Sequence, residues 1–362
     1  MGNRGYLRTQ EIFAMALIII SIKLTDSTPS LLAQKGQNGF WLIPILSFAL
    51  ILPGFLLMIY LLKKYENKNL IELFESILGQ WFGKLIGFIL FLFAFFAMTL
   101  DSRNYVEQIK LLYFPETPSD LIFIIFFGIV FFGAKKGIEV IGFTSWISFF
   151  VLNFFTFLII VLIWGDIVVE RIYPIFGSGL DHLLNQGYQK AAMFSEIFFF
   201  LIAYQAAKQT EMFRKGIVIA FTYGFFLIIL FYFIYVSVFD YNSIQKLAFP
   251  FHDITQYVNF GSFFTNIETI FMIFWLIAAY LKFMILLYAA GWIFGTIFNI
   301  QNFDPVLLPL AFLVVTIGLM PFNSIMNELV LRETLFMIMS PFFIFLPFLL
   351  WGIALMKGDL RK

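Results

Sequence analysis

The sequence predicts an all-α integral membrane protein with about ten transmembrane helices. Of its 362 residues, 61% are hydrophobic and 12% are charged, and the mean hydropathy is +0.93; an ordinary globular domain carries about 25% charged residues. The apolar runs are long and continuous, without the alternation of a membrane β-barrel. The net charge of +1, the lack of cysteine and the two histidines argue against a nucleic-acid partner, a disulfide and a Cys- or His-based metal site.

The first predicted span, at about 9–33, is interrupted near its middle. Lys23 is followed by the polar run 25–28 and by Pro29. Inside hydrocarbon an ionisable side chain or an unpaired backbone group costs a few kcal/mol. Proline also lacks an N–H and disfavours helical geometry at the residue before it. We therefore expect a discontinuous helix whose broken centre lines a polar cavity.

Further apolar runs place the other spans in order. In the first half we expect the second to fifth spans at about 40–62, 83–113, 120–132 and 141–164, and an interfacial helix at 69–78. The third span would be roughly 45 Å long and must tilt or protrude. In the second half we expect the sixth to tenth spans at about 188–207, 216–239, 263–298, 304–319 and 334–356, an irregular segment at 240–261, and a polar connector at 323–333.

Lysine and arginine are distributed unevenly between the connections. Fourteen of the 23 fall on the side that holds both termini and six on the other, while Lys23, Arg103 and Lys282 lie within spans. The positive-inside rule therefore places both termini in the cytoplasm and predicts an even number of spans. Arg4 and Arg8 precede the first span without a small-residue cleavage signature, so we do not expect a removable signal peptide.

The long polar loop at 165–187, expected to face outward, divides one transmembrane domain, 1–362, into two sets of five spans at 9–165 and 188–356. Because each half holds an odd number of spans, the two halves are expected to be inverted relative to each other. Each half also begins with a polar helix, as in inverted-repeat transporters. We therefore expect the first and sixth spans to occupy corresponding places.

Two interpretations of the break in the first span stay open. In one, freed N–H and C=O groups around 25–28 bind the amine and carboxylate of a small zwitterion, with a half-helix N-terminus favouring the anion. In the other, the break is a proline kink whose freed groups are satisfied by Ser and Thr side chains. The flanking Lys23 and Asp26 favour the polar cavity.

Two more ionisable residues lie deep within predicted spans. Glu196 is about nine residues into the sixth span, roughly 13 Å deep, where a carboxylate must be paired or protonated. It either binds a ligand amine or exchanges a proton, or it forms a purely structural ion pair with Lys23 or Lys282. Lys282 is too central to reach the surface, so we expect an internal partner, Asp26 or Glu196. The small, polar run 203–207 is a candidate for a second helix break.

A charged cluster lies toward the outer end of the third span. Asp101 and Tyr105 share one helix face, while Arg103 and Glu107 share another. We expect Asp101 and Arg103 to line an outer vestibule. We expect Glu107 and Lys110 to lie at a protruding helix end, among water and lipid headgroups.

No P-loop, no G-x-G-x-x-G on a strand and no H-E-x-x-H occurs in the sequence. We therefore expect neither an enzyme nor a bound cofactor, and an ATP-powered transporter within this chain is excluded.

Several short motifs follow one another along the chain. They are the Thr/Ser-rich break ending in Pro29, I-L-G-Q-W-F-G-K-L-I-G at 77–87, P-E-T-P at 115–118, K-G-I-E-V-I at 136–141 and F-S-E at 194–196. In this order they resemble the B subunit of bacterial spore germinant receptors, the spore germination permeases of the amino acid/polyamine/organocation superfamily. The chain departs from that family where the polar stretch 23–26 replaces a usual Gly in the break, and where Ser195 replaces a Gly before the span-six Glu.

The resemblance implies a 5+5 inverted-repeat (LeuT-like) fold, with a site between spans one and six and with spans three and eight alongside. It implies a subunit that binds a small nutrient, often an amino acid, from outside and starts spore germination. The family partners are a larger A subunit and a lipoprotein C subunit in the spore inner membrane. The candidate ligand-binding residues are Lys23, Leu24, Thr25, Asp26, Ser27, Thr28, Asp101, Tyr105, Glu196, Phe199, Phe200, Tyr204 and Lys282.

Three functions stay open: a nutrient receptor subunit, a proton- or cation-coupled amino-acid permease, and a structural subunit or ion conduit with a vestigial pocket. The resemblance favours the first. In transporters of this fold a cation often sits between spans one and eight. We hypothesise that the Lys282 ammonium replaces that cation, so that ligand binding needs no sodium.

Overall fold

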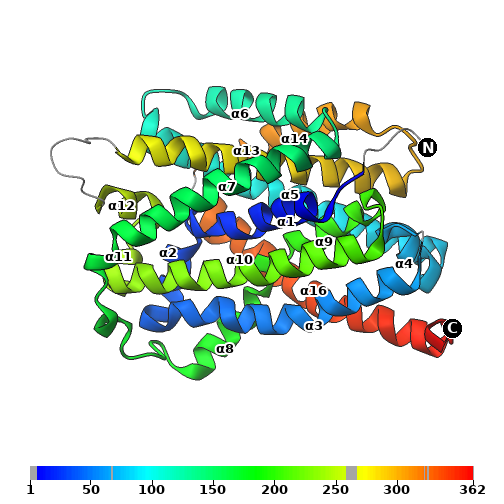
Figure 1. Cartoon of the computed structure of the whole chain (residues 1–362), viewed down its shortest axis with the longest axis horizontal. Coiled ribbons are helices and arrows are strands. Elements are labelled where there is room, and N and C mark those ends of the chain that lie inside the picture. Colours follow the sequence, from blue (N-terminus) through cyan, green and yellow to red (C-terminus); the bar gives the residue numbers. More distant parts are fainter. Residues whose placement is uncertain (1–5, 67, 258–266, 322, 324–325, 362) are drawn as a thin grey trace.

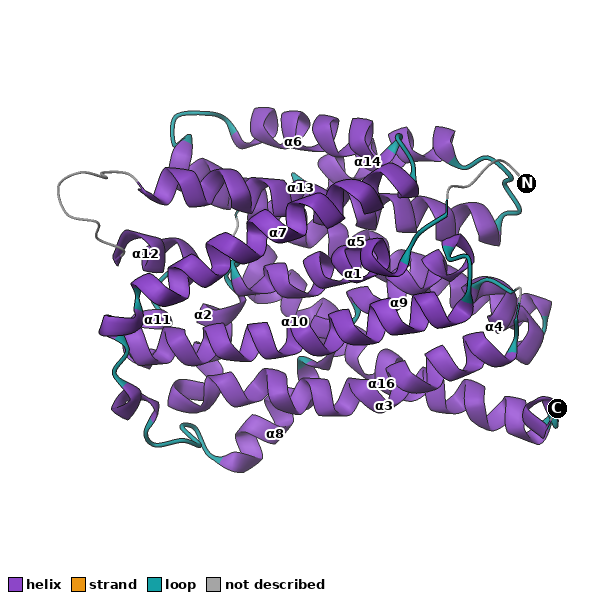
Figure 2. Ribbon diagram, in the orientation of Figure 1, coloured by secondary structure: helices purple, strands orange, loops and turns teal. Residues whose placement is uncertain are grey.

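Long apolar helices lying side by side make up most of the chain (Figures 1 and 2). The structure is a computed structural model that describes residues 6–66, 68–257, 267–321, 323 and 326–361. Within this part, six helices are long and apolar enough to cross a membrane, and three shorter apolar helices accompany them. The only extended pairing among the described residues is an isolated bridge between Leu7 and Ala207. The predicted all-α fold class is therefore confirmed.

The first half contains the broken first span and four further long helices. Its elements are α1 (Thr9–Ser21), η1 (Ile22–Leu24), α2 (Thr28–Gly36), η2 (Gln37–Leu42), α3 (Ile43–Lys64), α4 (Leu70–Leu78), α5 (Gln80–Tyr113), α6 (Ser119–Ala134), α7 (Ile138–Leu162), η3 (Trp164–Asp166), η4 (Val169–Ile172) and α8 (Leu180–Gln189). The predicted break therefore occurs between α1 and α2, and α4 is the predicted short interfacial helix.

The second half begins with an irregular span. Its elements are η5 (Ala191–Phe194), α9 (Glu196–Phe200), η6 (Leu201–Ala206), α10 (Thr210–Phe239), α11 (Tyr241–Ile244), α12 (Pro250–Tyr257), α13 (Ile267–Ile297), α14 (Asp304–Gly318), η8 (Asn327–Arg332), α16 (Glu333–Met356) and η9 (Asp359–Arg361). In the sixth span only α9 is α-helical, and 3₁₀ geometry resumes at Leu201, two residues before the predicted second break.

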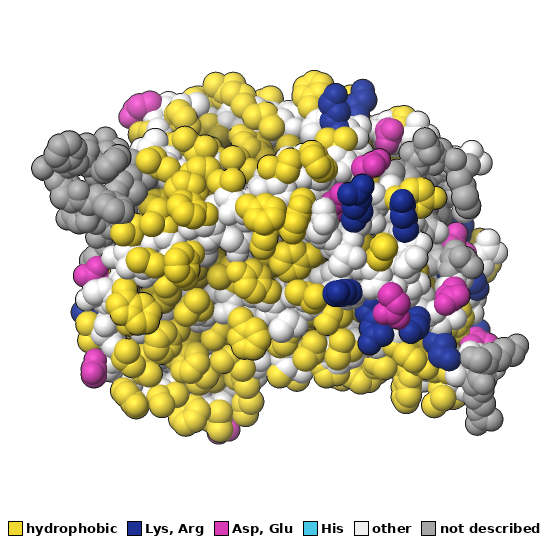
Figure 3. Space-filling model, in the orientation of Figure 1, with side chains coloured by type: hydrophobic (Ala, Val, Ile, Leu, Met, Phe, Trp, Pro, Cys, Tyr) yellow, Lys and Arg dark blue, Asp and Glu magenta, His cyan; other side chains and the backbone are white. Residues whose placement is uncertain are grey.

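Both termini lie at the same end of the bundle (Figure 1), as an even number of spans requires. Hydrophobic side chains cover most of the face in Figure 3, and Lys and Arg side chains gather toward the end where the termini lie. A lipid-facing surface needs this apolar covering because charge is costly in hydrocarbon. The cytoplasmic placement of that end stays a prediction.

Two glycines in the 77–87 motif explain how α4 folds back against α5. Gly79 has φ +87° and ends α4, a conformation that glycine adopts without the Cβ clash of other residues. At Gly83 a Cβ would lie 2.4 Å from the backbone of Glu75, so any side chain there would push the two helices apart. The motif is therefore a structural requirement of this corner.

The prediction for the tenth span was wrong at its start. We placed 323–333 in a polar connector, but helical structure begins at Asn327 as a π-helix, η8, and continues into α16. Arg332, which we counted among the outer connections, is 2% exposed. A π-helical turn widens the helix and is frequent at functional sites.

Glu107 does not lie at a solvated helix end: it is buried, Arg103 Nη2 lies 2.7 Å from its Oε1, and Ser119 Oγ donates to the same oxygen. The predicted start of span eight at residue 263, the end of the segment 240–261, and Arg4 lie outside the described residues.

Candidate functional site

The break in the first span has a local cause in its own side chains. Thr25 Oγ1 donates to the carbonyl oxygen of Ile22 at 2.6 Å, and the Thr28 N–H donates to Asp26 Oδ1 at 2.8 Å. Such short-range bonds compete with the helical ladder and favour a cap over a continuing helix. Pro29 then falls in the first turn of α2, where its missing N–H costs nothing.

Neighbouring helices satisfy the carbonyl groups that the break frees. Tyr235 donates to the carbonyl of Leu24 at 2.6 Å, and Gln108 Nε2 donates to the carbonyl of Thr25 at 3.1 Å. These donors come from α10 and α5, whereas the carbonyl of Ile22 accepts from the Thr25 side chain of the break itself. A ligand amine that binds here must therefore share these carbonyl oxygens with a protein donor or displace it.

A chain of buried ion pairs runs away from the break. Lys23 Nζ lies 3.2 Å from Glu196 Oε2, and Lys282 Nζ lies 3.2 Å from Glu196 Oε1. Lys282 also donates to Asp101 Oδ2 at 2.8 Å. All four residues are at most 4% exposed. The predicted internal partners of Glu196 and Lys282 therefore exist: of the two alternatives for Lys282, Glu196 is observed, and Asp101 is a further partner that was not predicted.

Arg332 extends this chain to the first turn of the tenth span. Its guanidinium lies 3.1 Å from Asp101 Oδ1 and 2.8 Å from Asp26 Oδ2, and it also contacts Glu328 Oε1. Ser27 Oγ donates to that same Glu328 oxygen at 2.5 Å. We call Lys23, Asp26, Asp101, Glu196, Lys282, Glu328 and Arg332 the central ionic network. It joins spans one, three, six, eight and ten.

The network is held together by mutual compensation of charge. Each cation taken out of water loses several kcal/mol of solvation, and each pair regains it only when both partners remain. Every carboxylate of the network faces a Lys or Arg of the same network. Among the described residues, no group of His, Cys, Asp and Glu is arranged to hold a metal ion.

An aromatic pair links the network to the break. Tyr105 stacks on Trp275 with ring centroids 5.5 Å apart and an interplanar angle of 8°, and Lys282 Nζ lies 5.3 Å from the Tyr105 ring centre. The Trp275 Nε1–H donates to Thr25 Oγ1 at 3.0 Å. A cation near an aromatic face is stabilised by the ring quadrupole. Trp275 therefore connects span eight directly to the polar run of span one.

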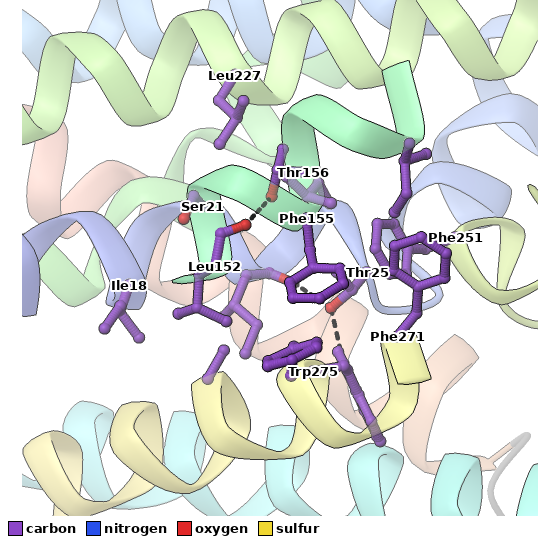
Figure 4. Close-up of a pocket in the computed structure, with 15 residues that line it drawn as sticks. Ile18, Ser21, Thr25, Leu152, Phe155, Thr156, Leu227, Phe251, Phe271 and Trp275 are labelled. Atoms are coloured by element: carbon purple, nitrogen blue, oxygen red, sulfur yellow. Dashed lines mark hydrogen bonds between the residues drawn. The ribbon is translucent and has the colours of Figure 1, made fainter. Parts of the chain in front are cut away.

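A cavity of about 80 Å³ lies beside the break, on the side of Trp275 (Figure 4). One water needs roughly 10–15 Å³ on this measure, so the cavity has room for a group of several heavy atoms. Ser21 and Thr25 contribute from the break, and rings of Phe155, Phe271 and Trp275 form apolar walls from α7 and α13. The cavity thus lies between span one and spans five, seven and eight.

The structure divides the candidate residues between these features. Leu24 and Thr25 line the cavity; Lys23, Asp26, Asp101, Glu196 and Lys282 belong to the network; Ser27, Thr28 and Tyr105 contact it. Phe199 packs on Phe343 and Phe200 stacks on Phe213. Tyr204 bonds Thr210 and lines a separate polar cavity of about 970 Å³ beside α4 and the start of α10. A ligand role for these three residues stays a prediction.

Reasoning from the sequence missed Arg332, Glu328 and Trp275. A signal for the first two exists, because Glu328 and Arg332 are opposite charges four residues apart directly before an apolar run. In the third span, Asn104 and Gln108 share the face of Asp101 and Tyr105, and both bond to the break. Nothing in the pattern around Trp275 distinguishes it from a membrane-interface tryptophan.

Helix α12 lies outside the membrane-spanning helices and contributes Phe251 to the cavity wall. Next to it, burial raises the pKa of Asp253 to about 6, against about 3.9 in an unfolded chain. Burial lowers the pKa of the neighbouring His252. Two ionisable groups beside the cavity thus favour their neutral forms.

A pH-dependent stability follows for α12. Because the folded-state pKa of Asp253 is raised, its contribution is complete below about pH 4 and is lost as the pH rises through about 6. We expect Asp253→Asn to raise the thermal unfolding midpoint relative to the wild type, increasingly so from pH 4 to pH 7. His252 is present in both proteins, so the difference isolates Asp253. A midpoint difference that is the same at every pH would contradict this assignment.

Comparison with known proteins identifies the family. A profile of the family described as "Spore germination protein" matches residues 7–326. The chain belongs to this family. It is 21% identical over 367 residues to spore germination protein KB of Bacillus subtilis (strain 168), with 99% of this chain and 97% of the relative covered. It is 23% identical to the putative spore germination protein YfkT of the same strain, covering 82% of this chain and 80% of the relative.

Solved transporter structures share the fold of this germination protein. MhsT in complex with L-phenylalanine superposes with a TM-score of 0.72 at 14% identity, covering 99% of this chain and 90% of that one. The nucleobase-cation-symport transporter Mhp1 gives 0.60 at 15% identity, covering 92% and 78%. These likenesses confirm the predicted inverted-repeat transporter fold of this integral membrane protein.

Proposed function

We propose that this germination protein is the membrane subunit of a germinant receptor, which binds a small nutrient beside the break of span one and so triggers germination. The cavity of about 80 Å³ next to Thr25 carries the proposal. It combines apolar aromatic walls with hydroxyl groups at the break, the mixture typical of small-molecule sites. An amino acid with an apolar side chain fits this chemistry.

The contacts around Thr25 indicate which helices move when the nutrient binds. Its hydroxyl accepts from Trp275, and its carbonyl accepts from Gln108. A nutrient amine or carboxylate at the break replaces these bonds and shifts spans three and eight against span one. A ligand changes an equilibrium between two conformations only by binding them with different affinity. The exchange of the Trp275 and Gln108 bonds for bonds to the nutrient supplies that difference in affinity.

The family suggests the remaining parts of the receptor. We propose that an A subunit and a lipoprotein C subunit accompany this chain in the spore inner membrane. Both termini then face the cytoplasm, and the nutrient arrives from the opposite side.

A proton- or cation-coupled amino-acid permease is the second candidate, because the chain has the fold of solved transporters. Uptake of labelled amino acids by proteoliposomes separates the two functions. A receptor subunit binds the nutrient without accumulating it, whereas accumulation driven by an ion gradient would favour the permease.

Nutrient binding itself is measured by thermal stabilisation of the purified protein against a panel of amino acids. A ligand at a hundred times its Kd stabilises the folded state by about 2.7 kcal/mol. We expect Ala278→Leu, which fills the cavity from α13, to abolish the shift caused by the active amino acid.

The matched control is Ile277→Phe, one residue away, where the side chain is 37% exposed on the outer surface of the bundle. This variant should keep the wild-type shift. An Ala278→Leu protein that still responds like the wild type would place the nutrient elsewhere and remove the support for this site.

A further inference from the structure

The central ionic network carries an imbalance of charge. It contains three cations, Lys23, Lys282 and Arg332. It contains four carboxylates, those of Asp26, Asp101, Glu196 and Glu328, and none of the seven residues is more than 8% exposed. With every group ionised, one negative charge remains uncompensated.

An uncompensated charge at this depth is not sustained. Burying an unpaired ion costs several kcal/mol, and a buried acid takes up a proton instead. A zwitterionic nutrient brings equal positive and negative charge, so it does not correct the imbalance. A single proton on one of the four carboxyl groups does.

The contacts of the four carboxyl groups single out one of them. Glu196 lies between two lysines, and Asp101 lies between Lys282 and Arg332. Asp26 accepts at both oxygens, from the Thr28 N–H and from Arg332. Each of these three carboxyl groups therefore has a cation or an N–H donor at both of its oxygens.

Glu328 differs from the other three. Its Oε1 accepts from both Ser27 and Arg332, whereas its Oε2 is buried with neither a hydrogen-bond partner nor a cation in contact. Both oxygens of Glu196 also lack a hydrogen-bond partner, but each lies 3.2 Å from a lysine ammonium. The only cation of Glu328, Arg332, is shared with Asp26 and Asp101. Two donors on one oxygen and none on the other fit a carboxylic acid with its proton on Oε2.

The charged groups around Glu328 leave no second cation for it. From α5, Asp101 bonds Arg332, and Arg103 is paired with Glu107. From the break, Asp26 adds a negative charge. On the same helix, Glu333 Oε1 lies 2.9 Å from Lys190 Nζ, and Glu333 Oε2 lies 4.0 Å from Nζ of the exposed Lys35. Both lysines are therefore paired with Glu333.

We propose that Glu328 is a proton-binding site that neutralises the central ionic network. It stands in the first π-helical turn of the tenth span, and its side chain is 10% exposed. Loss of the proton puts a second carboxylate beside Asp26, leaves the network with one uncompensated negative charge, and makes both carboxylates compete for Arg332. The contact of span ten with the break of span one, through Ser27 and Asp26, then weakens.

The test is infrared spectroscopy of the purified full chain in lipid nanodiscs without nutrient, in H₂O and D₂O. We expect the carbonyl-stretching band of a protonated carboxylic acid at neutral pH, shifted by D₂O. Glu328→Gln, which keeps the shape of the neutral acid, should remove the band. Glu333→Gln is the equivalent change five residues further along the same helix, and this variant should retain the band.

Raising the pH of the wild-type sample should make the band disappear reversibly, and this titration measures the affinity for the proton. Absence of the band in the wild type would overturn the proposal. Retention of the band in Glu328→Gln with loss in Glu196→Gln would overturn it as well, by moving the proton to Glu196. Because no nutrient is present, these outcomes do not depend on the proposed receptor function.

Discussion

Replacing Arg332 by methionine is expected to lower the free energy of unfolding by about 3–5 kcal/mol, the cost of removing one partner from a buried ion pair. Arg332 contacts the carboxyl groups of Asp26, Asp101 and Glu328 and is 2% exposed. Of these three groups, only Asp101 keeps a cation in contact after the loss, namely Lys282. Thermal and denaturant unfolding in detergent micelles measure the effect.

The control is Arg214→Met, because Arg214 is exposed and lies 3.7 Å from the equally exposed Glu211. An exposed pair contributes little to stability, because both charges remain solvated. Adding Asp26→Asn to Arg332→Met should recover part of the loss, since it removes a carboxylate that the loss of Arg332 leaves unpaired, and a double-mutant cycle measures this coupling. Equal effects of the Arg332 and Arg214 substitutions would show that the network is not a unit of stability.

Replacing Lys282 by methionine is expected to weaken nutrient binding in sodium-free buffer by roughly ten- to a hundredfold, which corresponds to about 1.5–3 kcal/mol for a bond to a charged group. The prediction rests on the proposed function and on the hypothesis that the Lys282 ammonium replaces a coupling cation. The ammonium lies between Asp101 and Glu196 and near the face of Tyr105. Nutrient-dependent thermal stabilisation with and without sodium measures it.

Sodium should restore part of the affinity of Lys282→Met, because a small cation can occupy the space between the two carboxylates. Lys190→Met is the matched control, a buried lysine outside the network that pairs with Glu333. Unchanged sodium-free affinity in Lys282→Met would end the hypothesis, whatever the stability of the variant.

Much of the central ionic network was predictable because its physical basis is independent of the fold. A charge in hydrocarbon needs a partner wherever it lies, so Glu196 and Lys282 were expected to have internal partners, with Lys23 or Lys282 as the possible partner of Glu196. Asp101 was expected to line an outer vestibule instead. The break was predictable for a similar reason, since Pro29 and the polar run before it cannot continue an apolar helix. The ion pairs between Glu196 and both lysines confirm this reasoning.

Other parts of the site depended on distances that no pattern contains. Asp26 pairs with Arg332, 306 positions along the chain, and Lys282 pairs with Asp101 in addition to its predicted partner Glu196. A short charged stretch before an apolar run is equally compatible with a connector and with the first turns of a span. Only packing of η8 against α5, where Asn327 donates to the carbonyl of Leu100 at 3.0 Å, decides the choice.

The sequence by itself therefore determined that this chain crosses the membrane repeatedly, that its first span is broken, and that ionisable groups meet inside it. Composition and the cost of buried charge act through local residues, and they need no tertiary information. The tertiary structure decided which charges pair, that Glu328 and Arg332 join them, and that the cavity lies beside Trp275. These depend on how helices distant in sequence approach one another, and that is set by the packing of the whole bundle.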